Sequence, residues 1–267
     1  MNMQDNSFKV LLLGDVIGQA GCRAVFFNLK SIIKKKNPDL VIINGENSAD
    51  GFGIIPKTAE QLFQSGADVI TTGNHVWQKP DGVQLLKDSV NILRPANYPE
   101  GAPGRGYCIV EKKGIKAAVI NLEGRESMSN LDCPFRSARE IIRKIKKEGN
   151  INIIVIDFHA ESTSEKESLA HYLDGDVSLI AGTHTHIQTA DEKILPRGTA
   201  YITDVGMTGP EESVIGSDKM IAIQRFMTQM PIKMEIAETD LMINGILAEF
   251  DPATGLAMGI ERIYEKV

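Results

Sequence analysis

Four of the five histidines in this chain stand beside glycine, aspartate, glutamate or asparagine at points where an apolar run ends. The runs that end in this way are VLLLGD, VIINGEN, VITTGNH, IVIDFH and SLIAGTHTH. The residues there that carry ligand atoms are Asp15, Glu46, Asn47, Asn74, His159, His184 and His186, and His75 directly follows Asn74. Carboxylate, amide and imidazole groups together are the ligands that hard and borderline divalent metals require. The sequence therefore predicts a metal site assembled from more than half of the chain.

The segment GTHTH adds a geometric argument. Residues two apart share a face of a strand, so His184 and His186 at a frayed strand end are placed to reach two separate ions of a close pair. A single histidine is as easily a buried imidazole bonded to the backbone, and Asn47 and Asn74 also suit turns with left-handed backbone. Four histidines at strand ends favour ligands over those simpler roles. His171, within ESLAHYLDG, has no such neighbours and is predicted to be structural.

The elements that must position these residues follow an α/β rhythm, in which short apolar runs alternate with helical patterns or Gly/Pro loops. Strands are predicted at 8–14, 40–44, 68–72, 91–94, 151–158, 178–182 and 200–204, with antiparallel hairpins at 107–121 and at 232–250, the latter continued by 256–264. Helices are predicted at 21–36, 56–65, 135–147 and 164–173, and loops at 95–106 and 207–216. The carboxyl ends of parallel strands open onto one crevice, where the candidate ligands converge.

Composition limits the class of protein. The 267 residues carry 35 Asp plus Glu against 29 Lys plus Arg, a formal net charge of −6, which argues against long nucleic acid as a partner. No repeat, linker or composition break divides the chain, so one domain spanning residues 1–267 is expected. No apolar run approaches the length of a membrane span, and the N-terminus lacks the order of a signal peptide. Cys22, Cys108 and Cys133 form no CxxC pair, which predicts reduced thiols in a cytoplasmic protein.

One glycine motif competes with the metal site. The segment GDVIGQAG at 14–21 follows a strand and opens a helix, as a dinucleotide-binding loop does. Its spacing is GxxxGxxG rather than GxGxxG, and Asp15 would set a carboxylate against the pyrophosphate, so that interpretation is rejected. No phosphate-binding GKS/GKT loop, GxSxG elbow or HExxH helix occurs.

Four arginines stand in loops flanked by glycine or proline, where a guanidinium can meet a phosphate or stack on a base. They are Arg94, Arg105, Arg125 and Arg197. An ordinary surface role remains the simpler expectation for each of them.

The ordered blocks GD, GEN, GNH, a lone histidine after a strand, and GTHTH resemble those of the calcineurin-like metallophosphoesterases. From residue 11 to about 216 the chain is more closely similar to the YmdB-type bacterial cyclic-nucleotide phosphodiesterases, most clearly in LLLGDVIGQAG, NGENSADGFGI, TTGNHVW and the block DFHAESTSEKESLAHYLDGDVSLIAGTHTH. This resemblance implies an α/β (α+β) fold of two mixed β-sheets packed as a sandwich with helices outside, in four αββα layers.

The resemblance also implies the roles of the residues. Asp15, Glu46, Asn47 and His186 would hold one metal ion, while Glu46, Asn74, His159 and His184 would hold the other, with Glu46 bridging the two. Two such ions lower the pKa of a shared water and neutralise phosphate charge. His75, beside the ligand Asn74, would protonate the leaving group.

Two departures from the wider superfamily agree with the YmdB-type branch. The usual first block is DxH, but Ile17 stands in the histidine position, and the usual bridging Asp is replaced by Glu46 followed by Asn47. The loss of an imidazole makes the first site harder, which favours iron or manganese over zinc.

The function expected from the resemblance is hydrolysis of small cyclic nucleotides of the 2′,3′-cyclic AMP type. A phosphatase or nuclease acting on another phosphoester with the same metals is the alternative within the enzyme class. From another class, the alternative is a regulatory protein that uses a weakly active metal site to sense a nucleotide or dock a partner. A homo-oligomer is expected from the resemblance, and edge strands in the hairpin at 232–250 offer one means of pairing.

Overall fold

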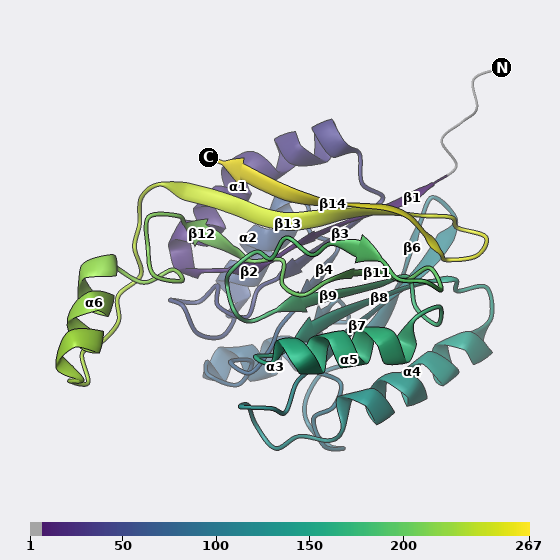
Figure 1. Cartoon of the computed structure of the whole chain (residues 1–267), viewed down its shortest axis with the longest axis horizontal. Helices are drawn as coiled ribbons and strands as arrows, with labels where there is room; N and C mark the ends of the chain where they lie inside the picture. The colour runs from purple at the N-terminus through teal and green to yellow at the C-terminus, as the bar shows by residue number, and fades with distance from the viewer. Residues whose placement is uncertain (1–6) are drawn as a thin grey trace.

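The computed structural model describes residues 7–267, which form two stacked β-sheets with helices on their outer faces (Figure 1). The first sheet has eight strands in the order β2-β12-β13-β1-β3-β4-β5, with β14 beside β13. Its strands are β1 (Phe8–Leu13), β2 (Asp15–Val16), β3 (Leu40–Asn44), β4 (Val69–Thr71), β5 (Ile92–Leu93), β12 (Met207–Pro210), β13 (Leu241–Phe250) and β14 (Ala257–Lys266). Strands β1, β3, β4 and β5 run parallel, whereas β13 is antiparallel to both β1 and β14.

The second sheet has six strands in the order β10-β11-β9-β8-β7-β6. They are β6 (Tyr107–Lys112), β7 (Ile115–Glu123), β8 (Ile153–His159), β9 (Leu179–Thr183), β10 (Lys193–Ile194) and β11 (Ala200–Ile202). The four central strands are parallel, and β6 and β10 are antiparallel edges. Both sheets are therefore mixed, as the sequence predicts.

Alternation of side chains along each central strand produces the layers, because successive residues of a strand point to opposite faces. On β1, Val10 and Leu12 face the second sheet and share a core with Val119 and Val155. Leu11 and Leu13 point the other way, toward α1 (Gly18–Lys36), α2 (Pro56–Ser65) and α3 (Pro80–Asp88). The opposite face of the second sheet is covered by α4 (Pro134–Glu148) and α5 (Thr163–Leu173). The expected four αββα layers are confirmed.

Local signals set several helix ends where the sequence predicts them. Helix α2 has its predicted bounds, with Pro56 at the first helical position and Gly66 just after the last, in left-handed geometry at φ 119°. Helix α1 begins at Gly18, three residues before its predicted start. Helices α3 and α6 (Lys219–Thr228) were not predicted from the sequence. No helix within 7–267 is long and apolar enough to cross a membrane.

The hairpin at 107–121 is confirmed, with its turn at Lys113 and Gly114. The predicted hairpin at 232–250 is wrong, because this stretch contains one strand, β13, which begins only at Leu241. Ile232, Met234 and Ile236 alternate as strand residues do, but only Ile236 forms a bridge, to Ser217. The hairpin partner of β13 is β14, and the predicted loop at 207–216 contains the short strand β12.

Candidate metal centre

The carboxyl ends of strands from both sheets meet at one place, and all eight predicted site residues lie there. Asp15 follows β1, Glu46 and Asn47 follow β3, and Asn74 and His75 follow β4 in the first sheet. His159 ends β8 and His184 follows β9 in the second sheet. The side chains of Asp15, Glu46, Asn47 and His159 are almost completely buried, so the site lies between the two sheets.

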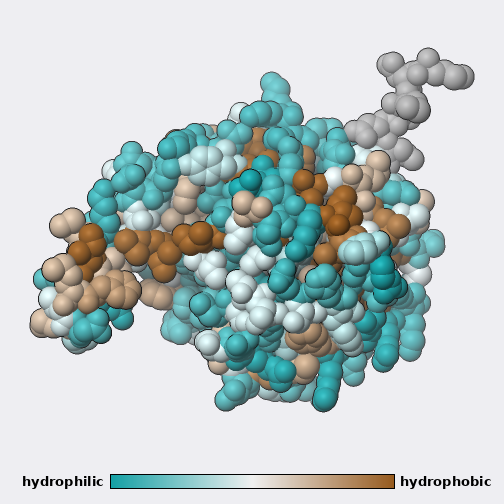
Figure 2. Space-filling model, in the orientation of Figure 1, coloured by the Kyte–Doolittle hydropathy of each residue, from teal (hydrophilic) through white to brown (hydrophobic). Residues whose placement is uncertain are grey.

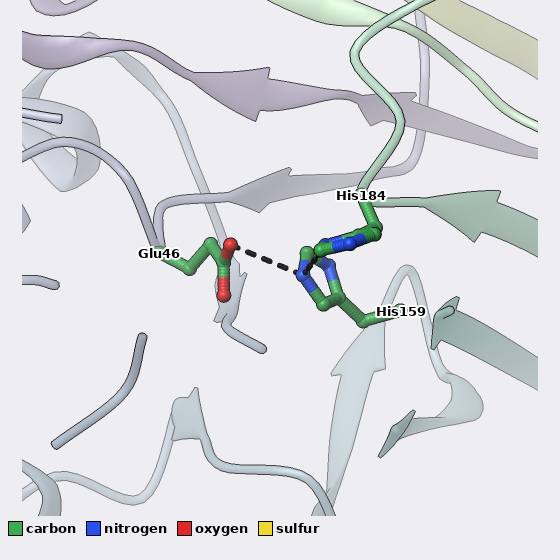
Figure 3. Close-up of side chains that lie close together, drawn as sticks. All are labelled: Glu46, His159 and His184. Carbon is green, nitrogen blue, oxygen red and sulfur yellow. Dashed lines mark hydrogen bonds and ion pairs between the residues drawn. The ribbon is translucent and has the colours of Figure 1, made fainter. Parts of the chain in front are cut away.

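His159 is the centre of the cluster. Its Nε2 atom lies 3.0 Å from Oδ1 of Asn74, 3.1 Å from Oε1 of Glu46 and 3.0 Å from Nδ1 of His184. Figure 3 shows Glu46 and the two rings converging from three separate elements. Candidate ligand atoms of Glu46, His159 and His184 lie within 4.8 Å of one another.

This crowding fits a cation better than a hydrogen-bond network. An imidazole nitrogen carries at most one proton, which satisfies only one of three surrounding acceptors. Ligands about 2.1 Å from one ion stand roughly 3 Å apart when they are adjacent, which is the spacing seen around Nε2 of His159. Oδ1 of Asp15 and Oε1 of Glu46 are also buried without a hydrogen-bond partner within residues 7–267. The donor set therefore fits a divalent metal.

A second group of candidate ligand atoms comes from Asp15, Asn47 and His186. Nε2 of His186 lies 3.2 Å from Nδ2 of the Asn47 side chain. Oδ2 of Asp15 accepts a hydrogen bond from the backbone N–H of His184 at 3.1 Å. Oδ1 of Asp15 also lies 3.8 Å from Nδ1 of His159, so this group adjoins the cluster at His159.

The two histidines of GTHTH are not aligned by a strand, because β9 ends at Thr183. The expectation that they share a strand face is therefore wrong. Both have left-handed backbone, with φ of 102° at His184 and 66° at His186, which costs of order 1–3 kcal/mol per residue and persists only where the surroundings enforce it. The backbone N–H of Thr185, between them, donates to Oδ2 of Asp204 at 3.1 Å.

Buried polar residues that the sequence did not single out hold the histidines in place. The Nδ1 atom of His159 lies 2.9 Å from Oγ1 of Thr183, which donates to Asp157 at 2.7 Å. Asp157 also accepts a hydrogen bond from Asn44 at 3.0 Å and one from Thr71. A polar residue inside an apolar strand, as in IVIDFH, is the signal that marks Asp157.

Charge couples the two central rings. Burial alone lowers the pKa of His159, but the carboxylates of Glu46 and Asp15 outweigh burial and raise it to about 9. Burial, followed by the nearby charge of His159, lowers the pKa of His184 to about 3. Burial raises the pKa of Asp15, whereas His159 and His75 overcome burial and hold the pKa of Glu46 well below its usual value. Near neutral pH the two rings are therefore not both positively charged.

His75 stands at the mouth of the cluster, with its side chain 24% exposed. Its Nδ1 atom lies 2.8 Å from Oδ1 of Asn47 and 3.4 Å from Oε1 of Glu46, and its backbone N–H donates to Oε2 of Glu46 at 3.2 Å. The ring packs edge-on against Phe52, with centroids 5.0 Å apart. His75 is thus held by Asn47 and Glu46 while part of it remains accessible.

A cleft of ≈ 400 Å³ opens over these residues. Its floor includes Glu46, Asn47, His75, His184 and His186, and its walls include the apolar residues Ile17, Phe52, Ile215, Met234 and Ile236. None of Arg94, Arg105, Arg125 and Arg197 lines it. Arg94 instead donates to the carbonyls of Pro95 and Pro103, which is a structural role.

Two glycines of the motifs are required by close approach. A Cβ at Gly73 would lie 2.2 Å from Cδ2 of His159 and 2.3 Å from Oε2 of Glu46. A Cβ at Gly14 would lie 1.8 Å from the carbonyl oxygen of Gly206. Gly14 thus lets the chain that enters β2 approach the chain that enters β12, beside the buried Asp15. The glycine is needed for this contact within the protein, which agrees with rejection of a dinucleotide loop.

The fold matches that of a Staphylococcus aureus protein described as a 5′-nucleotidase, with a TM-score of 0.60 at 13% identity over 96% of this chain and 54% of that chain. At 13% identity this neighbour shows the fold alone, and the cluster of Glu46, His159 and His184 could hold a metal ion. The chain belongs to the YmdB-like family, whose model, described as "YmdB-like protein", matches residues 11–263. The resemblance found in the sequence is confirmed.

Two relatives cover nearly all of the chain. It is 47% identical over 255 residues to the 2′,3′-cyclic-nucleotide 2′-phosphodiesterase of Bacillus subtilis, covering 96% of each protein. It also matches the crystal structure of a phosphatase from Mycoplasma pneumoniae with a TM-score of 0.90 and 35% identity, over 97% of this chain and 94% of that one. Both relatives are named as phosphoester hydrolases.

Proposed function

We propose that the protein is a metal-dependent phosphodiesterase that hydrolyses small cyclic nucleotides of the 2′,3′-cyclic AMP type. The observation that carries the proposal is the convergence of Asn74, Glu46 and His184 on Nε2 of His159, beside the partly exposed His75 in a cleft. The name of the Bacillus subtilis relative supports this substrate class. An acidic chain with no arginine in the cleft lining favours a small substrate over long nucleic acid.

The proposed ligands fall into two sets that share Glu46. Asp15, Asn47 and His186 complete the first set, and Asn74, His159 and His184 complete the second. When bound, the two ions supply positive charge that polarises the phosphate and activates water. Iron or manganese is favoured because Asn47 gives the first set an amide oxygen in place of an imidazole, although zinc also accepts these donors.

His75 is the proposed general acid. Its contact with Oδ1 of Asn47 orients the ring, and an imidazole is suited to protonate a departing alkoxide near neutral pH. Phe52 and the apolar wall beyond it would receive the nucleoside part of the substrate. We also propose that the chain acts as one domain, because the two sheets share a core and both contribute to the site.

The first test concerns the ions. The protein is stripped of metal, reloaded with manganese, iron or zinc, and assayed with 2′,3′-cyclic AMP, with metal content measured in parallel. We expect turnover to depend on metal, and Glu46→Gln to lower both metal content and turnover, the latter by at least about a hundredfold. The matched control is Glu167→Gln, which changes an exposed carboxylate on α5 that pairs with Lys193, and this variant should match the wild type. Two bound ions without turnover under any metal would refute the catalytic proposal and favour a sensing or docking role.

The second test concerns the acid. His75→Ala should keep its metal but lose roughly 10²–10⁴-fold in turnover of 2′,3′-cyclic AMP, whose alkoxide leaving group needs a proton. It should lose much less with bis(p-nitrophenyl) phosphate, because nitrophenolate leaves without protonation. Equal losses on the two substrates would contradict the assignment of His75 as the acid.

A further inference from the structure

The tight turn at residues 214–217 has an unfavourable residue at its tip. Val214 and Ser217 exchange two backbone hydrogen bonds, of 2.9 and 3.0 Å, so only Ile215 and Gly216 lie between the paired residues. Both have left-handed backbone, with φ of 48° at Ile215 and 99° at Gly216. A two-residue turn with positive φ at both positions is of type I′, which prefers asparagine, aspartate or glycine at the first position. A β-branched isoleucine is strained there.

Two contacts hold this turn in place. Nδ1 of His186 lies 2.9 Å from the carbonyl oxygen of Ile215. Because a carbonyl can only accept a hydrogen bond, Nδ1 carries the proton, and Nε2 is the nitrogen that remains free to bind a metal. On its other side the turn rests on Ile17, since a Cβ at Gly216 would lie 2.9 Å from Cγ2 of that side chain. The turn is therefore fixed between a candidate ligand and an apolar seat.

Ile17 stands where the wider superfamily has the histidine of its DxH block. In this chain it is buried and packs with Met207, Met242 and Ile236. An imidazole at this position would place a polar ring beneath Gly216, where the isoleucine makes apolar contact. The replacement of that histidine is thus coupled to the turn, because the side chain that takes its place is the one on which the turn rests.

The side chain of Ile215 contributes to the cleft and is 50% exposed. It lines the cleft together with Phe52, Met234 and Ile236. Figure 2 shows hydrophobic colouring that extends from the body onto the projection that carries α6, and Met234 and Ile236 follow α6 in the chain. Among the described residues, those that line the cleft include no lysine or arginine. This wall therefore suits the nucleoside of a substrate rather than its phosphate.

We propose that the strained turn at 214–217 serves the site in two ways. The carbonyl of Ile215 holds His186 with Nε2 free for a metal, and the side chain of Ile215 packs on the nucleoside of the substrate. The second part rests on the proposed phosphodiesterase function. Ile215→Asn eases the backbone, keeps the carbonyl and removes the apolar contact. It should therefore stabilise the fold while weakening substrate binding, a combination that loss of an ordinary packing residue does not produce.

Two measurements compare Ile215→Asn with the wild type. The Tm of the metal-free chain should rise by about 1–4 °C, because asparagine adopts positive φ at a lower cost. KM for 2′,3′-cyclic AMP should rise about three- to tenfold with little change in kcat, because one apolar contact with the nucleoside is lost. With methyl p-nitrophenyl phosphate, a diester that has no nucleoside, the rise in KM should stay below about twofold.

The matched control is Lys113→Asn in the turn between β6 and β7. Lys113 and Gly114 also have positive φ, of 51° and 78°, between directly paired strands. This turn precedes β7, whereas the candidate ligands lie beside the end of that strand. Lys113→Asn should leave KM unchanged. Only its KM is compared, because Lys113 also pairs with Asp39.

Gly216→Ala tests the contact with His186. The added Cβ would meet Ile17 at a residue with φ of 99°, so the turn should shift and its carbonyl should move away from Nδ1 of His186. In the metal-free chain at pH 8, 15N NMR should show the His186 ring protonated at Nδ1 in the wild type and a mixture of both tautomers in the variant. Manganese affinity should fall by about tenfold or more.

The results that would contradict the proposal differ for its two parts. An unchanged KM in Ile215→Asn, or a lower Tm, would overturn the role of the side chain. A wild-type His186 protonated at Nε2 would overturn the role of the carbonyl. If the wild type hydrolyses no diester with any metal, the proposed function fails. The Tm and the tautomer need no turnover, so they still decide whether the turn is strained and holds His186.

Discussion

The loop that carries His184 and His186 rests on a buried ion pair, and this pair gives a prediction that can be worked through in numbers. Nζ of Lys166 lies 2.8 Å from Oδ2 of Asp204, and neither side chain is exposed. The same carboxylate accepts backbone hydrogen bonds from Thr185 at 3.1 Å and from Gly206 at 2.9 Å. Lys166 therefore neutralises the group that anchors the loop between the two histidines.

The change Lys166→Met keeps most of the buried aliphatic length and removes only the charge. Loss of one partner of a buried pair costs about 3–5 kcal/mol because the remaining charge is uncompensated. The two backbone donors still solvate Asp204, so we expect about 3 kcal/mol. For a chain of 267 residues, an unfolding entropy of about 2.1 cal/mol/K per residue converts this to a fall in Tm of about 5 °C.

A double-mutant cycle separates the pair from its surroundings. Asp204→Asn should also cost about 3 kcal/mol, because it leaves the lysine charge buried and unpaired. The double variant has no buried charge and should cost much less than the sum, giving a coupling of about 2–3 kcal/mol. Urea unfolding of the metal-free chain measures these free energies. The metal affinity of Asp204→Asn should also fall by about 10–100-fold, because the loop anchor is weakened.

The control is the exposed pair of Glu167 and Lys193, whose Oε1 and Nζ atoms lie 3.3 Å apart. Glu167 is suited to this comparison because it adjoins Lys166 on the same helix. The cycle for that pair should give less than about 1 kcal/mol. Additive losses for Lys166 and Asp204, or a loss below about 1 kcal/mol for Lys166→Met, would show that the buried pair does not support the loop.

Three further results are expected. Gly73→Ala should lose metal and turnover while remaining folded, because its Cβ would lie 2.2 Å from a ring carbon of the histidine that ends β8; metal analysis and circular dichroism check this. Phe52→Leu should raise KM for 2′,3′-cyclic AMP about five- to fiftyfold with little change in kcat if the ring stacks on the base. Burial raises the pKa of Cys22 and Cys108 to about 12. Iodoacetamide at pH 8 should therefore label only Cys133 in the folded chain, and the free energy of unfolding should fall above about pH 9, where the unfolded thiols ionise.

Much of the candidate site follows from sequence because its residues are placed by strand ends. Asp15, Glu46, Asn74 and His159 each end an apolar run, and parallel strands bring such ends together whatever lies between them. The roles of these residues remain proposals, whereas their convergence is a structural result.

Errors arose where one pattern fits two structures. The alternation of Ile232, Met234 and Ile236 fits a strand, but these residues lie between α6 and β13, and Met234 and Ile236 line the cleft. Lys166 gives no signal in sequence, because a lysine in a helix is ordinarily exposed, and only the fold shows that it faces Asp204.

The sequence by itself determined the α/β class, the bounds of α2 and the residue types that gather at the strand ends, because these depend on periodicity and on local caps. Only the tertiary structure decided that Nε2 of His159 faces atoms of Asn74, Glu46 and His184, that the GTHTH loop is left-handed at both histidines, and that α6 stands away from the body. Those features depend on contacts between residues far apart in the chain. Local pattern contains no information about which distant surface a side chain will meet.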